Sequence, residues 1–147
     1  MTVLVVLLVS WFVFRLLGGF GVPIFLSWHE SVRYALAVMF LFTSVAHFNS
    51  LKHDLAGMIP AWLPGPLVIV TVTGIFEIAG AIGLMLPHDA HRIAAYCLMA
   101  LLVPMFLANF HGARSGATLR GKPVTPLWLR APMQLFFIAL LWWSARP

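Results

Sequence analysis

One apolar run, from Leu67 to Leu86, limits how this chain can fold more than any other feature, because a single carboxylate, Glu77, lies at its middle. An apolar helix of this length crosses a bilayer. An acidic side chain at the centre of a membrane span costs about 2.5–3.5 kcal/mol when it faces lipid, so Glu77 should face protein or water. The run therefore predicts a membrane-spanning helix whose acid is shielded by neighbouring spans.

The rest of the chain has the same apolar character. Of its 147 residues, 62% are hydrophobic and 9% are charged, against about 45–50% and 25% in soluble domains. A soluble domain of this size cannot bury so much apolar surface, so the composition predicts a polytopic membrane protein. The first residues lack the basic segment and the small-residue cleavage site of a signal peptide, and we expect them to form a retained membrane helix.

Five apolar segments follow one another, and we expect all five to be helices, because lipid offers no partner for an open sheet edge. They cover residues 2–20, 33–48, 67–86, 92–110 and 132–145. Glycine- and proline-rich breaks separate them. Five of the six tryptophans lie at segment ends, where aromatic side chains meet the membrane surface. The expected fold class is therefore all-α, a polytopic membrane helical bundle.

The net charge of +5 does not indicate nucleic-acid binding, because the nine Lys and Arg residues are spread over the predicted helix ends. A nucleic-acid reader would carry a basic stripe on a soluble surface. Positive charge at helix ends instead fits a membrane protein, whose partner is the lipid bilayer. The single cysteine, Cys97, has no second thiol, which excludes an internal disulfide and thiol redox chemistry within the chain.

Alternating crossings divide the loops between two membrane surfaces. The N-terminus, the 49–66 loop and the 111–131 loop share one surface, here called side A, and the remaining loops share side B. Five Lys and Arg residues fall on side A, against three or four on side B. The excess favours a cytoplasmic side A only narrowly, so the positive-inside rule leaves the orientation open.

The polar side chains of the last four segments converge on the side A half of the membrane. Helical spacing of i,i+4 puts three pairs each on one helix face: Thr43 with His47, Thr73 with Glu77, and Arg130 with Gln134. Asn109 approaches the same side at the end of its segment. We expect these groups to form a polar vestibule above Glu77. The alternative, that they only hydrogen-bond one helix to another, stays open.

Each of these residues has a candidate role in binding a small molecule. Glu77 would accept or donate a proton at the floor of the pocket, as a neutral acid or as an anion paired with a neighbouring cation. His47 and Arg130 would orient the headgroup of the ligand near the mouth. Asn109 and Gln134 would form a hydrogen-bonding wall, and Trp62 with the proline-rich loop around it would form a lid. Thr73, on the same helix face as Glu77, is a further ligand-binding candidate.

Two arrangements of histidines suggest metal binding. His88 and His91 lie in one turn with Asp89 between them, which makes a weak zinc pattern. His47 and His111 approach side A from two helices, an arrangement that can hold haem. Neither pattern has a supporting feature elsewhere in the chain, so no metal site is predicted.

Several short motifs resemble the DoxX and DoxX-like family of small four-helix membrane proteins, in order along residues 33–146. They are Ala46-His47-Phe48, Met58-Ile59-Pro60-Ala61-Trp62-Leu63-Pro64, Gly74-Ile75-Phe76-Glu77-Ile78, Gly83-Leu84-Met85-Leu86-Pro87, Ala108-Asn109-Phe110 and Leu127-Trp128-Leu129-Arg130-Ala131-Pro132-Met133-Gln134. The resemblance implies a four-helix bundle in the cytoplasmic membrane of a prokaryote, with some relatives in quinone-linked sulfur oxidation or in redox assemblies with partner proteins. The chain departs from that pattern by an added N-terminal transmembrane segment, residues 1–30, before the DoxX-like four-helix domain, residues 31–147.

Together these observations predict an integral membrane protein that binds a small lipophilic molecule, such as a quinone, as a component of an oxidoreductase system. The sequence encodes no electron carrier, so redox turnover would need a partner protein or a diffusible cofactor. Two alternatives stay open: a non-catalytic membrane assembly subunit, and a small proton-coupled transporter. The lack of an inverted repeat argues mildly against the transporter. The sequence does not decide whether the protein is an enzyme.

Overall fold

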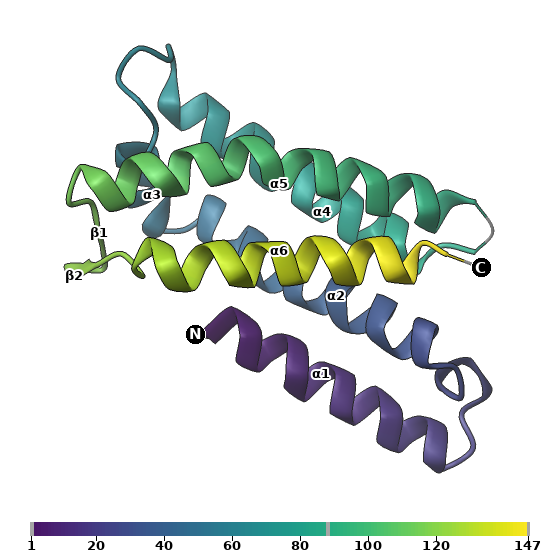
Figure 1. Cartoon of the computed structure of the whole chain (residues 1–147). Helices are drawn as coiled ribbons and strands as arrows, with labels where there is room; N and C mark the ends of the chain where they lie inside the picture. The colour runs from purple at the N-terminus through teal and green to yellow at the C-terminus, as the bar shows by residue number, and fades with distance from the viewer. Residues whose placement is uncertain (1, 88, 147) are drawn as a thin grey trace.

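The computed structural model describes residues 2–87 and 89–146, and this part of the chain is mostly helical, as the sequence predicted (Figure 1). Its five long helices match the five apolar segments: α1 (Thr2–Gly19), α2 (Trp28–Ser44), α4 (Pro66–Met85), α5 (Ala90–Arg114) and α6 (Leu127–Ser144). The expectation of an all-α chain needs one correction. The loop before α6 contains a small antiparallel hairpin of two-residue strands, β1 (Thr118–Leu119) and β2 (Lys122–Pro123).

Short elements connect the long helices. The 3₁₀ turn Pro23–Phe25 joins α1 to α2, and a second 3₁₀ turn, Val45–His47, continues α2. The chain then bends by 86° into the short helix α3 (Leu51–Gly57). Pro66 begins α4, a position where the missing N–H of proline costs nothing because the first N–H groups of a helix have no helical partner.

Four of the long helices close into a ring, in which α2 packs on α4, α4 on α5, α5 on α6, and α6 returns to α2. Helix α1 lies outside this ring and packs mainly against α2 (Figure 1). Small residues bring α4 and α5 together, since a Cβ atom at Gly80 would lie 2.5 Å from Leu98 and one at Gly83 would lie 2.6 Å from Ala94. Such contacts are typical of helices that associate in membranes.

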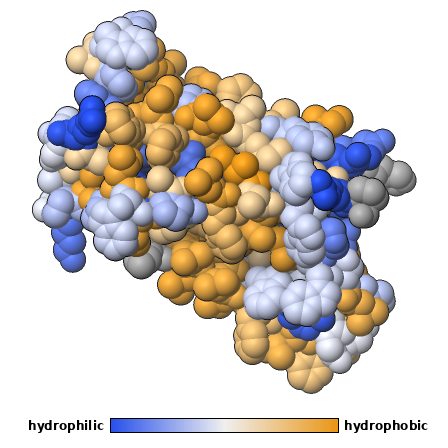
Figure 2. Space-filling view, viewed as in Figure 1, coloured by the Kyte–Doolittle hydropathy of each residue, from blue (hydrophilic) through white to orange (hydrophobic). Residues whose placement is uncertain are grey.

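Three described helices, α1, α4 and α5, are long and apolar enough to cross a membrane, and α2 joins them when it is taken together with α3. Helix α6 is as long as α1 but less apolar, because its first half carries Arg130 and Gln134. Figure 2 shows hydrophobic residues over much of the middle of the visible face and hydrophilic residues gathered toward its two ends. This distribution is compatible with a membrane protein.

Helix α1 makes two close contacts with the turn that follows it. The guanidinium of Arg15 donates hydrogen bonds to the carbonyl oxygens of Phe25 and Leu26, at 3.0 and 2.9 Å. Next to it, a Cβ atom at Gly18 would lie only 2.2 Å from the same oxygen of Phe25. The turn can close only because Gly18 has no side chain.

We expect Gly18→Ala to destabilise the protein by about 1–3 kcal/mol, the usual cost of overpacking, because the backbone of the turn must move away. Thermal unfolding in detergent measures this loss. Gly19→Ala is the matched control, since a Cβ atom there meets nothing within 4 Å and alanine favours the helix. An unfolding temperature for Gly18→Ala equal to that of Gly19→Ala would contradict the close contact between α1 and the turn.

Candidate functional site

A cavity of about 590 Å³ lies among α2, α4, α5 and α6, at the side A end of the ring. Its walls are mostly apolar, with a few polar groups among them. The apolar part includes Met39, Phe40, Leu102, Met105, Met133 and Phe137. The size and composition are typical of a site for a small molecule.

Glu77 is the most buried polar residue among those that line the cavity. It lies near the middle of α4, and only 2% of the residue is exposed. Its carboxyl oxygen Oε2 is 3.2 Å from the hydroxyl of Thr43 on α2, which donates to it. The same hydroxyl lies 3.0 Å from the carbonyl oxygen of Phe40. Because a hydroxyl has one hydrogen, Thr43 donates to one of these oxygens at a time.

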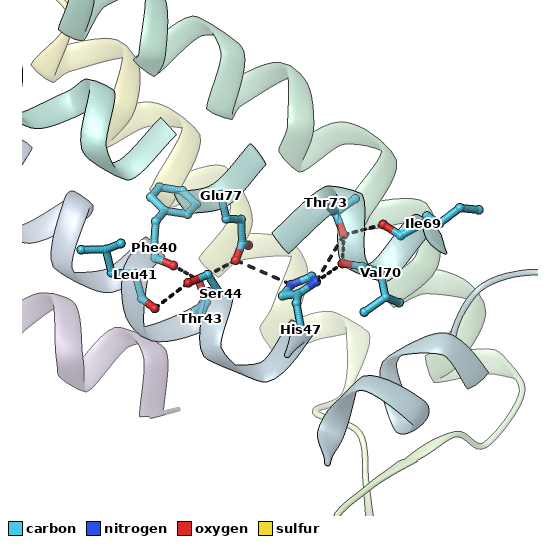
Figure 3. Close-up of polar contacts among 9 residues, drawn as sticks. All are labelled: Phe40, Leu41, Thr43, Ser44, His47, Ile69, Val70, Thr73 and Glu77. Atoms are coloured by element: carbon cyan, nitrogen blue, oxygen red, sulfur yellow. Dashed lines mark hydrogen bonds and ion pairs between the residues drawn. The ribbon is translucent and has the colours of Figure 1, made fainter. Parts of the chain in front are cut away.

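His47 stands between Glu77 and Thr73, as Figure 3 shows. Its Nδ1 atom is 2.7 Å from the carbonyl oxygen of Val70. A carbonyl oxygen only accepts, so Nδ1 carries the hydrogen, and in the neutral ring the lone pair belongs to Nε2. Nε2 lies 3.6 Å from Oε2 of Glu77. The backbone of α4 thus fixes which nitrogen of the ring faces the buried acid.

Thr73 contacts the imidazole ring of His47. Its hydroxyl lies 3.2 Å from Nδ1 of His47 and donates to the carbonyl oxygens of Ile69 or Val70 on the preceding turn of α4. It is not among the residues that line the cavity. Thr73, which the sequence suggested as a ligand-binding residue, instead contacts the imidazole on the side away from Glu77.

The opposite wall comes from α5 and α6. The guanidinium of Arg130 donates a hydrogen bond to the side-chain oxygen of Asn109, and the amide of Gln134 donates to the carbonyl oxygen of Leu102. All three polar side chains also line the cavity. They therefore join α5 to α6 and at the same time present polar atoms to the same space as Glu77.

The structure brings together five of the seven residues singled out from the sequence: Glu77, His47, Asn109, Arg130 and Gln134. Trp62 lies elsewhere, in the loop before α4, where it is 77% exposed and does not line the cavity. The mouth is bordered instead by residues just before and within α3, and by residues of the hairpin and of the loop after it: Asn49, Leu51, Leu55, Arg120 and Thr125.

Arg120 also lines the cavity, although it was not among the residues predicted from the sequence, where one weak signal pointed to it. Arg120 precedes Gly121 in a short polar stretch between β1 and β2, which is typical of a hairpin turn. From sequence, this stretch was predicted to be part of the 111–131 loop, without a hairpin. Which side chain of such a turn faces a cavity depends on how the hairpin docks, and here the carboxylate of Asp54 on α3 accepts a hydrogen bond from the backbone N–H of Arg120 at 2.9 Å.

The histidines do not gather into a metal site in the part of the chain that the structure describes, where no three His, Cys, Asp or Glu side chains lie together. The weak zinc pattern of His88 and His91 includes His88, which lies outside the described residues.

Fold and site define a class of mostly helical proteins, with several helices apolar enough to cross a membrane and a buried acid on the wall of a largely apolar cavity. Within this class, the chain belongs to the family described as Domain of unknown function (DUF8561), whose model matches residues 36–145. The match covers the second half of α2 and all of α3 to α6, and α1 precedes it. No curated protein and no solved structure matches the chain.

This family assignment corrects the resemblance to the DoxX and DoxX-like family, which was wrong. The motifs that suggested it combine apolar residues with glycine, proline, tryptophan and a single polar residue near helix ends. Membrane helices favour these residue types at these places in general. Short runs of these residue types therefore reflect a common environment more than a common ancestor. No family relationship now supports the link to quinone chemistry.

Proposed function

We propose that this chain is an integral protein of the cytoplasmic membrane that binds a small lipophilic molecule with a polar head in the cavity above Glu77. The observation that carries the proposal is that Glu77, buried at the middle of an apolar helix, borders a cavity of about 590 Å³. An ionisable group at such a depth is costly and usually serves a function. A purely structural acid would be expected to pack against protein on every side.

In this proposal α1, α2, α4, α5 and α6 cross the membrane, and α3 with the hairpin lies at its side A surface. Five crossings put the cavity in the side A half of the bilayer, within reach of molecules dissolved in the lipid. Phe42 and Val45 support this route, because they line the cavity and are also 47% and 56% exposed on the apolar surface.

The chemical identity of the polar head is not specified by this proposal. A quinone of an oxidoreductase system is one member of the class: its carbonyl oxygens would accept hydrogen bonds from groups such as Thr43 and Arg130. Glu77 would then exchange a proton with it, the imidazole Nε2 of His47 being the nearest base. Electrons would come from a redox partner protein or a diffusible cofactor.

Purified protein should carry a lipophilic molecule that organic solvent extracts in an amount about equimolar to the chain. Ala46→Trp should remove most of it, because Ala46 lines the cavity and an indole would fill the space. Ala139→Trp on the exposed face of α6 is the matched control and should retain the molecule. Mass spectrometry of the extract identifies the molecule, and equal retention in both variants would contradict binding in this cavity.

A further inference from the structure

We propose that the occupant of the cavity is an amphiphile from the bilayer with an anionic head, a carboxylate or a phosphate, and that Arg130 and Arg120 hold this head at the mouth. The inference rests on the proposed function and names the chemical class of its ligand. Two cationic side chains line a largely apolar cavity, and neither has an anionic partner among the described residues.

Arg130 lies in the first turn of α6 and is half-buried. Its one hydrogen-bond acceptor among the described residues is the neutral amide oxygen of Asn109. A guanidinium has five N–H donors in a planar fork that matches the two oxygens of a carboxylate or phosphate. A guanidinium with one neutral acceptor and no nearby anion is unfavourable beside apolar walls. An anionic head would supply the missing acceptors and the opposite charge.

Arg120 is held at the mouth by the hairpin. Its backbone is left-handed, with φ at 53°, a conformation that is unfavourable for residues other than glycine. The hydrogen bond from its backbone N–H to Asp54 supports this conformation. The carboxylate of Asp54 thus binds the backbone of Arg120, and it lies beyond 4.0 Å from the guanidinium. The hairpin keeps a strained arginine over the cavity with its charge free for a ligand.

The charges along the cavity are arranged by depth. Glu77 is the one carboxylate among the described lining residues, and it lies at the middle of α4 beside His47. Both arginines lie at the side A end, in the hairpin and the first turn of α6. An amphiphile therefore finds positive charge at the mouth, apolar walls below it and a proton-exchanging group at the floor. An anionic head would bind at the mouth, away from Glu77.

The test uses full-length protein in phosphatidylcholine nanodiscs and four radiolabelled probes, with binding to empty nanodiscs subtracted. Dodecanoate and dodecyl phosphate carry the anionic heads, and dodecanol and decylubiquinone carry neutral ones. We expect the two anions to bind at least about tenfold more tightly than dodecanol, a ratio expected for one charge-assisted interaction. Competition by added phosphatidylglycerol would identify a lipid headgroup as the source, and its absence would identify a free fatty acid or phosphate ester. Either result supports the inference.

Arg130→Gln and Arg120→Gln should each weaken dodecanoate binding about tenfold and leave dodecanol binding unchanged. Arg114→Gln is the matched control, since Arg114 is exposed at the same end and does not line the cavity. Arg130 also joins α6 to α5, so Arg120→Gln on the hairpin tests the inference even if Arg130→Gln fails to fold. Tight binding of decylubiquinone without preference for the anions would overturn the inference and leave the proposed function standing. Binding of none of the probes by folded protein would overturn both.

Discussion

Gly74→Ala should separate His47 from the buried acid and greatly weaken ligand binding in the cavity. Gly74 is buried in α4, and a Cβ atom there would lie 2.5 Å from Cβ and 2.9 Å from Cγ of His47. These atoms are the base of the side chain, so His47 cannot avoid the methyl group by changing rotamer. The 3₁₀ turn that carries His47 would have to move away from α4, which breaks the hydrogen bond to the carbonyl oxygen of Val70.

Overpacking costs about 1–3 kcal/mol and the lost hydrogen bond about 1 kcal/mol more, so the unfolding temperature in detergent should also fall. Gly57→Ala adds the same methyl group at the end of α3, where a Cβ atom meets nothing within 4 Å. This control should bind ligand like the unaltered protein. Normal ligand retention in folded Gly74→Ala protein would show that the position of His47 is not required.

The long helices could be predicted from sequence because apolar runs of sufficient length have one stable form in lipid. Their boundaries were less accurate where polar residues begin a helix. Helix α2 begins at Trp28 rather than near residue 33, and its added first turn includes His29 and Glu30. Helix α6 begins at Leu127 rather than at Pro132, because a proline within a helix is tolerated where neighbouring groups satisfy the backbone.

The candidate site was predictable in outline because alternating crossings bring the same ends of several helices together. This reasoning fixes the depth of a residue and its helix face, which was enough to bring Glu77, His47 and Arg130 to one cavity. It does not fix contacts that depend on the docking of short irregular elements. Trp62 and Arg120 lie in such elements, and sequence alone could not decide which of the two would border the cavity.

On the proposed function, replacing Glu77 with glutamine should leave the fold intact and stop the proton exchange that we expect to accompany ligand binding. The amide has the shape of the acid, and its oxygen can still accept the hydrogen bond from Thr43. We therefore expect the free energy of unfolding to change by less than about 1 kcal/mol, the net value of one hydrogen bond. An amide does not titrate, however, and so it cannot pass a proton to Nε2 of His47 or to an occupant.

The measurement is the number of protons released or taken up when the co-purified molecule is added back to ligand-free protein in weakly buffered nanodiscs. Glu30→Gln is the matched control, because Glu30 pairs with Arg33 at the other end of α2 and lies outside the cavity. This variant should exchange as many protons as the unaltered protein. If the Glu77→Gln variant exchanges as many protons as the unaltered protein, the buried carboxyl only joins α4 to α2 through Thr43. That result would contradict the proton-exchange role and would favour a non-catalytic assembly subunit.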